Sequence, residues 1–549
     1  MSGAWAPLAL PAFRALWLAN LVSDIGSAMH AVGAGWLMTQ LAPSPLMVAL
    51  VQAATMAPMF LLLLPAGALG DILDRRRLLI FAQLWSVAAA AALGAVTFAG
   101  WISPQTLLLL TLALGIGNAL AIPSFQTVVP ELVPRERLPD AVSLSSMGVN
   151  IARAAGPAIA GVLISLAGVA TVFLFNAASF LLTVIVLWRW RREPKAAALP
   201  PEHLVAALRT GWRYAMHNPE LRAVLVRSAS FFTFAAGLWA LLPLVGAQKM
   251  PTSANGYAIL LSALGVGAVI AALSLPKLRP KLSSDHLSAI STIVFAAATA
   301  AAATVESFAV VAAFMLPAGW AWLANLTTFN ITARFTIADW VMARGLAINQ
   351  MTFFGCQVLG SVLWGQLAAL TSVGTALAAS AAGMLFALVA AWRFHLVTPA
   401  KEALKPSVHW AEPIVHVADP DTRGPTLTTV EYRIDPDHAQ GFLAALAELA
   451  RSRRRNGGYG WAVYEDVEEP GRYVEHFLSD SWVDHLRQHQ RTTLGDKAAQ
   501  DKVRAFHRGE RPPKVSHLAA PARNNMASVQ TIEGPAGRSK SAESSSPAA

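Results

Sequence analysis

Long apolar stretches separated by short polar segments occupy the chain from about residue 13 to residue 395. Most of these stretches hold about 20 or more residues, the length that a helix rising ~1.5 Å per residue needs to cross a bilayer. The pattern therefore predicts an all-α polytopic membrane protein with about twelve transmembrane helices. The predicted spans are residues 13–39, 46–69, 78–99, 104–123, 139–167, 169–190, 222–248, 254–275, 286–305, 308–330, 343–369 and 373–395.

The predicted spans fall into two groups of six. Residues 13–190 are the predicted N-terminal bundle and residues 222–395 the C-terminal bundle, joined by a linker at residues 191–221. A polar, proline-containing segment of this kind is typical of a domain boundary. Inside it, Leu204 and Leu208 begin a helical pattern of apolar residues, which predicts a short helix that is either solvated or in contact with the membrane surface.

The two groups also resemble one another in sequence. A shift of about 204 positions places span five over span eleven, with Arg153, Gly156 and Gly161 over Gln357, Gly360 and Gly365. Parallel repeats of this kind relate the two halves of some transporters, with the solute site between them near the middle of the membrane. We therefore expect a parallel repeat with a solute route between the halves.

The number and placement of charged residues narrow the possible class of protein further. Only 13% of residues are charged while 55% are hydrophobic, which excludes an ordinary soluble protein. The net charge of +10 is compatible with a nucleic-acid partner, but the basic residues gather in alternate loops between the spans. By the positive-inside rule this alternation predicts that both termini and the linker are cytoplasmic. We therefore expect a lipid bilayer around the chain and no nucleic-acid partner.

Beyond the spans, residues 420–520 alternate strand-like and helix-like stretches. The order β-α-β-β-α-β predicts a small α+β ferredoxin-like domain in the cytoplasm. Strands are expected at 426–434, 460–467, 472–479 and 514–518, and helices at 436–455 and 481–508. Residues 521–549 are rich in Ser, Ala and Pro and are expected to be disordered.

Two histidines of this predicted domain, His485 and His489, lie one helical turn apart, a spacing that suits a metal. No third ligand and no cofactor loop is evident in the sequence, so a polar helix face is the preferred interpretation. We expect no metal and no cofactor. Dimerisation through the sheet, or regulation, is favoured over catalysis.

Ionisable residues inside the spans are the candidates for transport. Asp24 lies about 11 residues into the first span and Arg153 about 14 into the fifth, so a helix rise of ~1.5 Å places both near the middle of the membrane. An ionisable group at that depth is costly and by default faces a cavity or a partner. We therefore expect Asp24 and Arg153 to pair. His30, Asn150 and Gln357 are further candidates for the solute or proton pathway, with hydrogen bonding between helices as the alternative.

The turn after the second span suggests a family. Residues 67–76, Gly-Ala-Leu-Gly-Asp-Ile-Leu-Asp-Arg-Arg, resemble the loop between the second and third spans of the major facilitator superfamily. The resemblance implies that Gly67, Asp71, Arg75 and Arg76 form a gating motif that latches the cytoplasmic face during alternating access. Residues 275–281 of the second half have no matching aspartate.

Two further motifs point to exporters. Residues 153–161 resemble the span-five motif of drug and metabolite exporters, in which Gly156, Pro157 and Gly161 permit close helix packing, although Ala160 replaces a glycine. Residues 130–138, Pro-Glu-Leu-Val-Pro-Arg-Glu-Arg-Leu, resemble the transmembrane secretion effector branch, which includes enterobactin exporters. Some members of that branch append a similar soluble domain with a run like residues 481–489, and the predicted α+β domain resembles the monooxygenase-like ferredoxin fold.

The resemblance implies a secondary active transporter of the bacterial inner membrane, not an enzyme. It would export a small organic molecule such as a siderophore, drug or metabolite by alternating access, in antiport with protons. Span four lacks the arginine of many proton-coupled exporters, which weakens the proton assignment. The absence of a phosphate-binding glycine loop disfavours an ATP-driven pump. The alternative is a membrane-anchored enzyme or sensor whose C-terminal domain carries the activity.

Overall fold

The computed structural model describes residues 5–190 except 43 and 73, then 204–250, 254–389, 393–397, 401–405, 407 and 425–520. The chain divides into two compact units, residues 1–404 and 405–549. The predicted disordered tail at 521–549 and the first part of the predicted linker, 191–203, lie outside the described residues.

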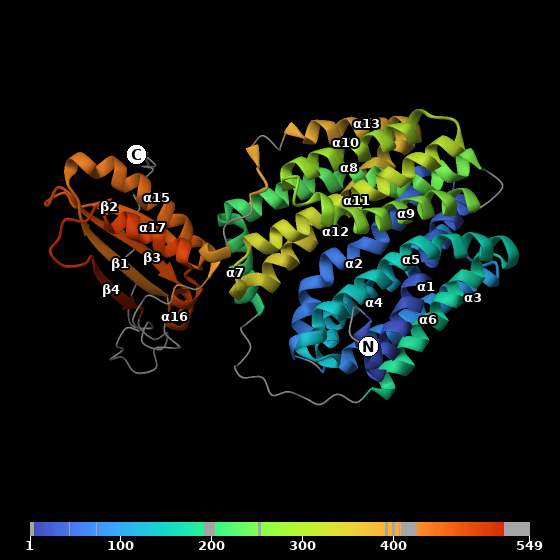
Figure 1. Ribbon diagram of the computed structural model, residues 1–549, viewed down its shortest axis with the longest axis horizontal. Coiled ribbons are helices and arrows are strands. Elements are labelled where there is room, and N and C mark those ends of the chain that lie inside the picture. The colour runs from blue at the N-terminus through green and yellow to red at the C-terminus, as the bar shows by residue number, and fades with distance from the viewer. Residues whose placement is uncertain are drawn as a thin grey trace, which may run out of the picture. The chain divides into compact units, whose positions relative to one another are not determined.

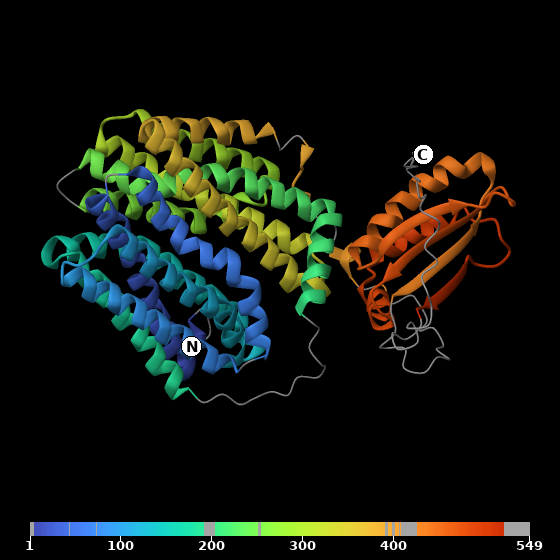
Figure 2. The same cartoon turned by 180° about the vertical axis from the view of Figure 1, so that it is seen from behind.

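The first unit is helical and contains one long helix for every predicted span. Figures 1 and 2 show these helices gathered in two bundles. The first bundle holds α1 (Pro11–Leu41), α2 (Pro45–Ile72), α3 (Arg75–Phe98), α4 (Pro104–Leu132), α5 (Leu138–Ala167) and α6 (Val169–Arg189). The second holds α8 (Pro219–Lys249), α9 (Asn255–Leu278), α10 (Ser284–Thr304), α11 (Phe308–Thr336), α12 (Met342–Leu370) and α13 (Val373–Ala387). The predicted fold class is confirmed.

Among the described residues, ten of these helices are long and apolar enough to cross a membrane. The other two are α1, whose apolar run is interrupted by Asp24 and His30, and α13, which has 15 residues in its described range. Short 3-10 turns lie at Ala6–Ala9, Arg135–Arg137, Asp339–Val341, Lys401–Leu404 and Pro436–His438.

Helix packing repeats between the bundles. In the first bundle α1 packs on α5 and α6, α2 on α4, and α3 on α4 and α6. The second bundle has the same pattern, with α8 on α12 and α13, α9 on α11, and α10 on α11 and α13. Between the bundles, α2 packs on α12 and α5 on α9. Each of these helix pairs has its counterpart in the other half, so the expected parallel repeat is confirmed.

The glycines that suggested the repeat occupy equivalent contacts. A Cβ added to Gly156 would lie 2.6 Å from Ala28 Cβ on α1, and one added to Gly360 would collide with the Thr233 carbonyl oxygen on α8. In both halves this glycine packs on the first helix of its own bundle. Because no side chain fits in that space, glycine is what allows the two backbones to approach.

The second glycine of each pair packs across the interface between the bundles. A Cβ on Gly161 would lie 2.9 Å from Ala258 Cβ at the start of α9, and one on Gly365 would lie 2.5 Å from Ala49 Cβ at the start of α2. Gly161 and Gly365 are both near the ends of their helices. The two contacts therefore bring the bundles together at the same end, where α5 and α12 end and α2 and α9 begin.

The expected linker helix is present as α7, Leu204–His217. Tyr214 on this helix is 1% exposed, and its hydroxyl accepts a hydrogen bond from Ala338 N at 3.0 Å and donates one to Thr336 O at 3.2 Å. Its ring also meets Trp340 edge-on, with centroids 5.6 Å apart. α7 is therefore docked on the turn between α11 and α12 of the second bundle.

The second unit has the predicted β-α-β-β-α-β order (Figure 1). Its strands β1 (Thr426–Arg433), β2 (Tyr459–Glu465), β3 (Arg472–Ser479) and β4 (Lys514–Ala519) form one sheet in the order β2-β3-β1-β4. All neighbours are antiparallel. Helix α15 (Ala439–Arg455) supplies Phe442, Leu446 and Leu449 to the core, each 1% exposed or less.

The second predicted helix of this unit is divided in two. Instead of one helix over 481–508, α16 (Trp482–Arg491) and α17 (Leu494–Arg504) are separated at Thr492 and Thr493. Thr493 and Asp496 form a capping box, in which each side chain accepts from the backbone N–H of the other residue. The box satisfies the amides that begin a new helix. The pattern Thr-x-x-Asp is visible in the sequence and could have predicted the break.

We predict that an added methyl group is tolerated at one glycine of α5 and destabilising at another. Gly156→Ala should destabilise the membrane unit by about 1–3 kcal/mol, because its Cβ collides with α1. Gly148→Ala should be neutral, since the nearest atom, Trp17 Nε1, lies at an ordinary 3.7 Å from the added Cβ. Thermal unfolding of the purified protein in detergent measures both. Equal midpoints for the two variants would contradict the packing described for α1 and α5.

Candidate transport site

Asp24 on α1 and Arg153 on α5 lie on neighbouring helices and interact electrostatically. Asp24 is half-buried, whereas Arg153 is exposed. Both residues are described, and no direct ion pair joins them in this structure. The two opposite charges therefore lie close enough to influence one another, and their pairing stays a prediction.

His30 is buried in α1, and neither ring nitrogen has a hydrogen-bond partner in the described structure. Its ring packs against Phe173 of α6, with centroids 5.1 Å apart. A buried imidazole without a partner is costly, because its polar atoms lose water and gain nothing in return. His30 is thus a polar group that packing alone does not explain.

Gln357 and Asn150 differ in burial and in hydrogen bonding. Gln357 on α12 is 1% exposed, and its side-chain oxygen has no partner among the described residues. Asn150 is half-buried and donates a hydrogen bond to Ser146 O, one turn back in its own helix, at 3.0 Å. No hydrogen bond joins any two of Asp24, His30 and Gln357 in the part of the chain that the structure describes. The candidates are distributed over three helices, and their roles remain predictions.

The charged turn between α2 and α3 ties helices of the first bundle together. Arg75 Nη1 forms an ion pair with Glu131 Oε1 at the end of α4, at 3.2 Å. Arg76 donates to the carbonyl oxygens of Leu187 and Trp188 at the end of α6, at 2.8 and 2.6 Å. A cation near a helix C-terminus is favoured by the helix dipole. Both arginines therefore connect helix ends within the first bundle.

The other two members of the predicted gating motif, Gly67 and Asp71, belong to α2, but the surroundings of Gly67 and the side chain of Asp71 are not among the described features. The gating role of Gly67, Asp71, Arg75 and Arg76 stays a prediction.

Pro157, which belongs to the predicted helix-packing motif, is buried inside α5 beside Gly156.

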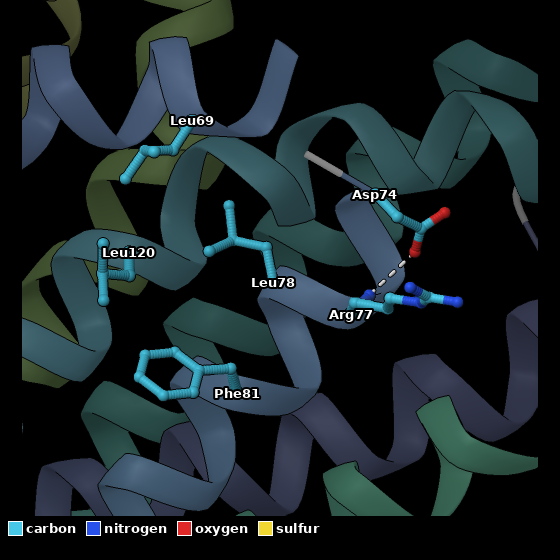
Figure 3. Close-up of a pocket in the computed structure, with 6 residues that line it drawn as sticks. All are labelled: Leu69, Asp74, Arg77, Leu78, Phe81 and Leu120. Atoms are coloured by element: carbon cyan, nitrogen blue, oxygen red, sulfur yellow. Dashed lines mark hydrogen bonds between the residues drawn. The ribbon is translucent and has the colours of Figure 1, made fainter. Parts of the chain in front are cut away.

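Beside the charged turn is a pocket of about 380 Å³. Figure 3 shows Asp74 accepting a hydrogen bond from the backbone N–H of Arg77 at 2.9 Å, which caps α3. The lining residues are Leu69, Asp74, Arg77, Leu78, Phe81 and Leu120. None of the candidate transport residues lines this pocket, so we assign no solute to it.

A polar network in the second bundle was not found from the sequence. Arg227 of α8 is 4% exposed, and its Nη1 forms an ion pair with Asp285 Oδ1 at 2.9 Å. Its Nη2 donates to Ser288 at 3.3 Å, and Ser288 donates to Asn325 of α11 at 2.8 Å. Asp285 also accepts from the backbone N–H of Leu396, beyond α13.

The network resembles the charged turn of the first bundle. In the first bundle the start of the third helix is tied to the end of the sixth, and in the second it is tied to the segment that follows the sixth. Arg227 lies five residues inside the predicted span 222–248, and this charge within an apolar stretch was the signal that the sequence offered.

A second buried ion pair lies in the α+β unit. Glu475 of β3 is fully buried and accepts hydrogen bonds from Arg453 Nε at 3.3 Å, Tyr432 Oη at 3.0 Å and Trp461 Nε1 at 3.0 Å. Burial, and then the Glu475 carboxylate, raises the pKa of Tyr432 well above its ordinary value, so the phenol keeps its proton as donor. Three donors satisfy this carboxylate, which is what a buried charge requires.

Twelve helices in two repeated bundles, with ionisable side chains inside the membrane-spanning segments, define a transporter of the major facilitator type. Residues 2–525 match the transmembrane secretion effector family, and the chain belongs to that family. It is a multi-pass membrane protein. The resemblance of the C-terminal unit to a monooxygenase-like fold stays a prediction.

Two siderophore transporters are among the curated relatives. The chain is 25% identical over 278 residues to the staphyloferrin A transporter of Staphylococcus aureus (strain NCTC 8325 / PS 47), a match that covers 49% of this chain and 68% of the relative. It is 26% identical over 285 residues to the enterobactin exporter EntS of Escherichia coli O1:K1 / APEC, covering 52% of this chain and 67% of that protein.

Solved transporter structures share the fold. A bacterial homologue of the human lysosomal transporter Spinster, in an inward-facing unoccupied conformation, has a TM-score of 0.55 at 16% identity and covers 69% of this chain and 94% of its own. The nucleoside transporter NupG has a TM-score of 0.56 at 13% identity, covering 70% and 98%. At these identities the likeness shows the fold alone.

We predict that Arg227→Gln lowers the free energy of unfolding of the membrane unit by about 2–3 kcal/mol, because Asp285 loses its charged partner. The effect should fall below the ~3–5 kcal/mol of a fully buried pair, since the Asp285 side chain is 30% exposed. Arg222→Gln, an exposed arginine on the same helix, is the control. Thermal unfolding in detergent should separate the two variants. A loss of the same size in both would show that the ion pair is not the cause.

Proposed function

We propose that this transporter exports a small organic molecule of the siderophore class by alternating access, in exchange for protons. The observation that carries the proposal is the presence of two opposite charges, Asp24 and Arg153, midway along the adjacent helices α1 and α5. Membership of the secretion effector family and the names of the two relatives support the solute class and the direction.

The proposed role of Asp24 is to accept and release the driving proton. A carboxylate at membrane depth is costly when charged, so its protonation responds strongly to the solvent and charges around it. When Asp24 is ionised, it offers Arg153 a partner of opposite sign and can accept hydrogen bonds from the hydroxyl or amide groups of a solute. When Asp24 is protonated, that attraction is lost, so a proton and the solute exclude one another at this residue, as exchange requires.

The proposed movement opens and closes the contacts between the bundles. Gly161 against α9 and Gly365 against α2 lie at one end of the interface. We place this end at the outer face of the membrane, following the predicted cytoplasmic position of the termini. Rocking of one bundle against the other would separate these paired contacts together, because the repeat makes them equivalent.

His30 and Gln357 are proposed to lie along the same pathway. Each presents a buried polar atom without a partner in the described residues, and a passing solute, proton or water can satisfy such atoms. Asn150, which bonds to its own helix, is the weaker candidate.

We predict that export depends on Asp24 and on a proton gradient. Efflux of a panel of siderophores, dyes and antibiotics is measured in vesicles with and without a pH gradient. In Asp24→Asn, gradient-driven export should fall at least about tenfold, because the proton carrier is lost. Glu306→Gln, an exposed carboxylate in the loop before α11, should export normally. Export that is insensitive to the gradient in the unaltered protein would remove the proton role, and failure of every siderophore would remove the solute class.

We predict that Asp24 and Arg153 compensate for one another. Asp24→Arg or Arg153→Asp alone should reduce folded protein, because each places two like charges together inside the membrane. The double exchange should recover part of that loss, since opposite charges again face each other. Yield of monodisperse protein after gel filtration is the readout. Stable single variants combined with an unstable double variant would argue against the pairing.

The alternative places the activity in the C-terminal unit. Residues 1–400 expressed alone should retain export if the helices are the transporter, whereas loss of export with activity in residues 420–520 would favour a membrane-anchored enzyme. Loss of regulation alone would favour a sensor.

A further inference from the structure

Three histidines converge in the C-terminal unit. His485 and His489 come from α16, and His517 comes from β4. One ring nitrogen of each lies within 4.8 Å of those of the other two. The centroid of the His485 ring is 4.6 Å from both the His489 and the His517 ring. Helical spacing in the sequence joins only His485 and His489, because His517 reaches the cluster through the pairing of β4 with β1.

The sheet register explains how His517 comes to lie beside the helix. Thr428 of β1 pairs with His517 of β4. The Thr428 hydroxyl also lies 3.3 Å from Nδ1 of His485. Thr428 therefore connects the strand that carries one histidine with the helix that carries the other two.

His485 is the least exposed member of the cluster. It is 2% exposed, and its Nε2 has no hydrogen-bond partner in the described structure. The described residues therefore leave the hydrogen-bonding capacity of this buried nitrogen unused. His489 and His517 are only partly buried, which leaves the cluster accessible from solvent.

We propose that His485, His489 and His517 bind a divalent transition-metal ion, with Zn²⁺ as the best match. Imidazole nitrogens suit zinc, and three histidines with an open fourth position form a known type of zinc coordination. Main-group cations such as Mg²⁺ and Ca²⁺ prefer oxygen ligands and are disfavoured here.

Thr428 supplies the outer support that such a site needs. Metal-bound histidines usually donate their second ring N–H to a neighbouring oxygen, which fixes the tautomer. With Nδ1–H of His485 donating to the Thr428 hydroxyl, Nε2 carries the lone pair and is the atom without a partner.

The ring nitrogens of the three histidines lie farther apart than they would around a bound zinc ion. Nitrogens bound at ~2.0–2.1 Å to one tetrahedral zinc lie about 3.4 Å apart. The nitrogens within 4.8 Å of each other must therefore draw together by up to about 1.4 Å. Small side-chain rotations of His489 and His517, the more exposed members, can supply this movement.

The test uses the full chain in detergent, purified without a histidine tag and stripped with a chelator. Co²⁺ and Zn²⁺ are then titrated, with visible absorption reporting Co²⁺ coordination and elemental analysis giving the stoichiometry. We expect about one ion per chain, with Zn²⁺ displacing Co²⁺. His485→Ala, His489→Ala and His517→Ala should each abolish the Co²⁺ bands. Thr428→Val should weaken affinity by about tenfold or more, as outer-shell changes do.

The control is His438→Ala, a histidine outside the cluster with a side chain 60% exposed, which should bind like the unaltered protein. X-ray absorption of the Zn²⁺-loaded unaltered chain counts its imidazole ligands independently of any variant. Three imidazoles support the proposal, whereas fewer than three overturn it. It is also overturned if the unaltered chain binds less than about 0.2 ion per chain, or if a folded cluster variant binds as tightly as the unaltered chain.

Discussion

Close backbone contact between helices is the constraint on which the membrane unit depends. Inside a bilayer, apolar side chains gain little by leaving lipid for one another, so helices associate by packing closely. Gly156 and Gly161 on α5, and Gly360 and Gly365 on α12, provide that closeness at equivalent places. One glycine of each pair holds a bundle together, while the other brings the two bundles into contact. The same residue type therefore serves both the stability of each half and the interface at which the halves meet.

Charged groups at the ends of the helices are paired more closely than those midway along the helices. At the ends of the helices, arginines are fully engaged: Arg76 binds the end of α6, and Arg227 joins α8 to α10. Midway along α1 and α5, Asp24 and Arg153 are near one another without a direct ion pair. The arginines at the helix ends thus have close partners, whereas the pairing of Asp24 with Arg153 stays a prediction.

The sequence was most informative where the signal is periodic. Apolar length located every long helix of the first unit, and alternation located the strands of the second. It failed where a feature depends on residues far apart in the chain. The partner of Arg75, Glu131, lies on another helix, and His517 reaches its cluster only through the register of β4 on β1. The split between α16 and α17 was different, because its cause, the Thr493 capping box, is local and was overlooked. Depth in the membrane could be estimated from helix rise, but whether Asp24 faces Arg153 directly could not.

The docking of α7 has a consequence for observing the transporter at work. Tyr214 fastens this helix to the turn between α11 and α12, so α7 belongs mechanically to the second bundle although it precedes it in the chain. Trp212, on the same helix, is 58% exposed. A spectroscopic label at that position, combined with one on the first bundle, would report the distance between the two bundles.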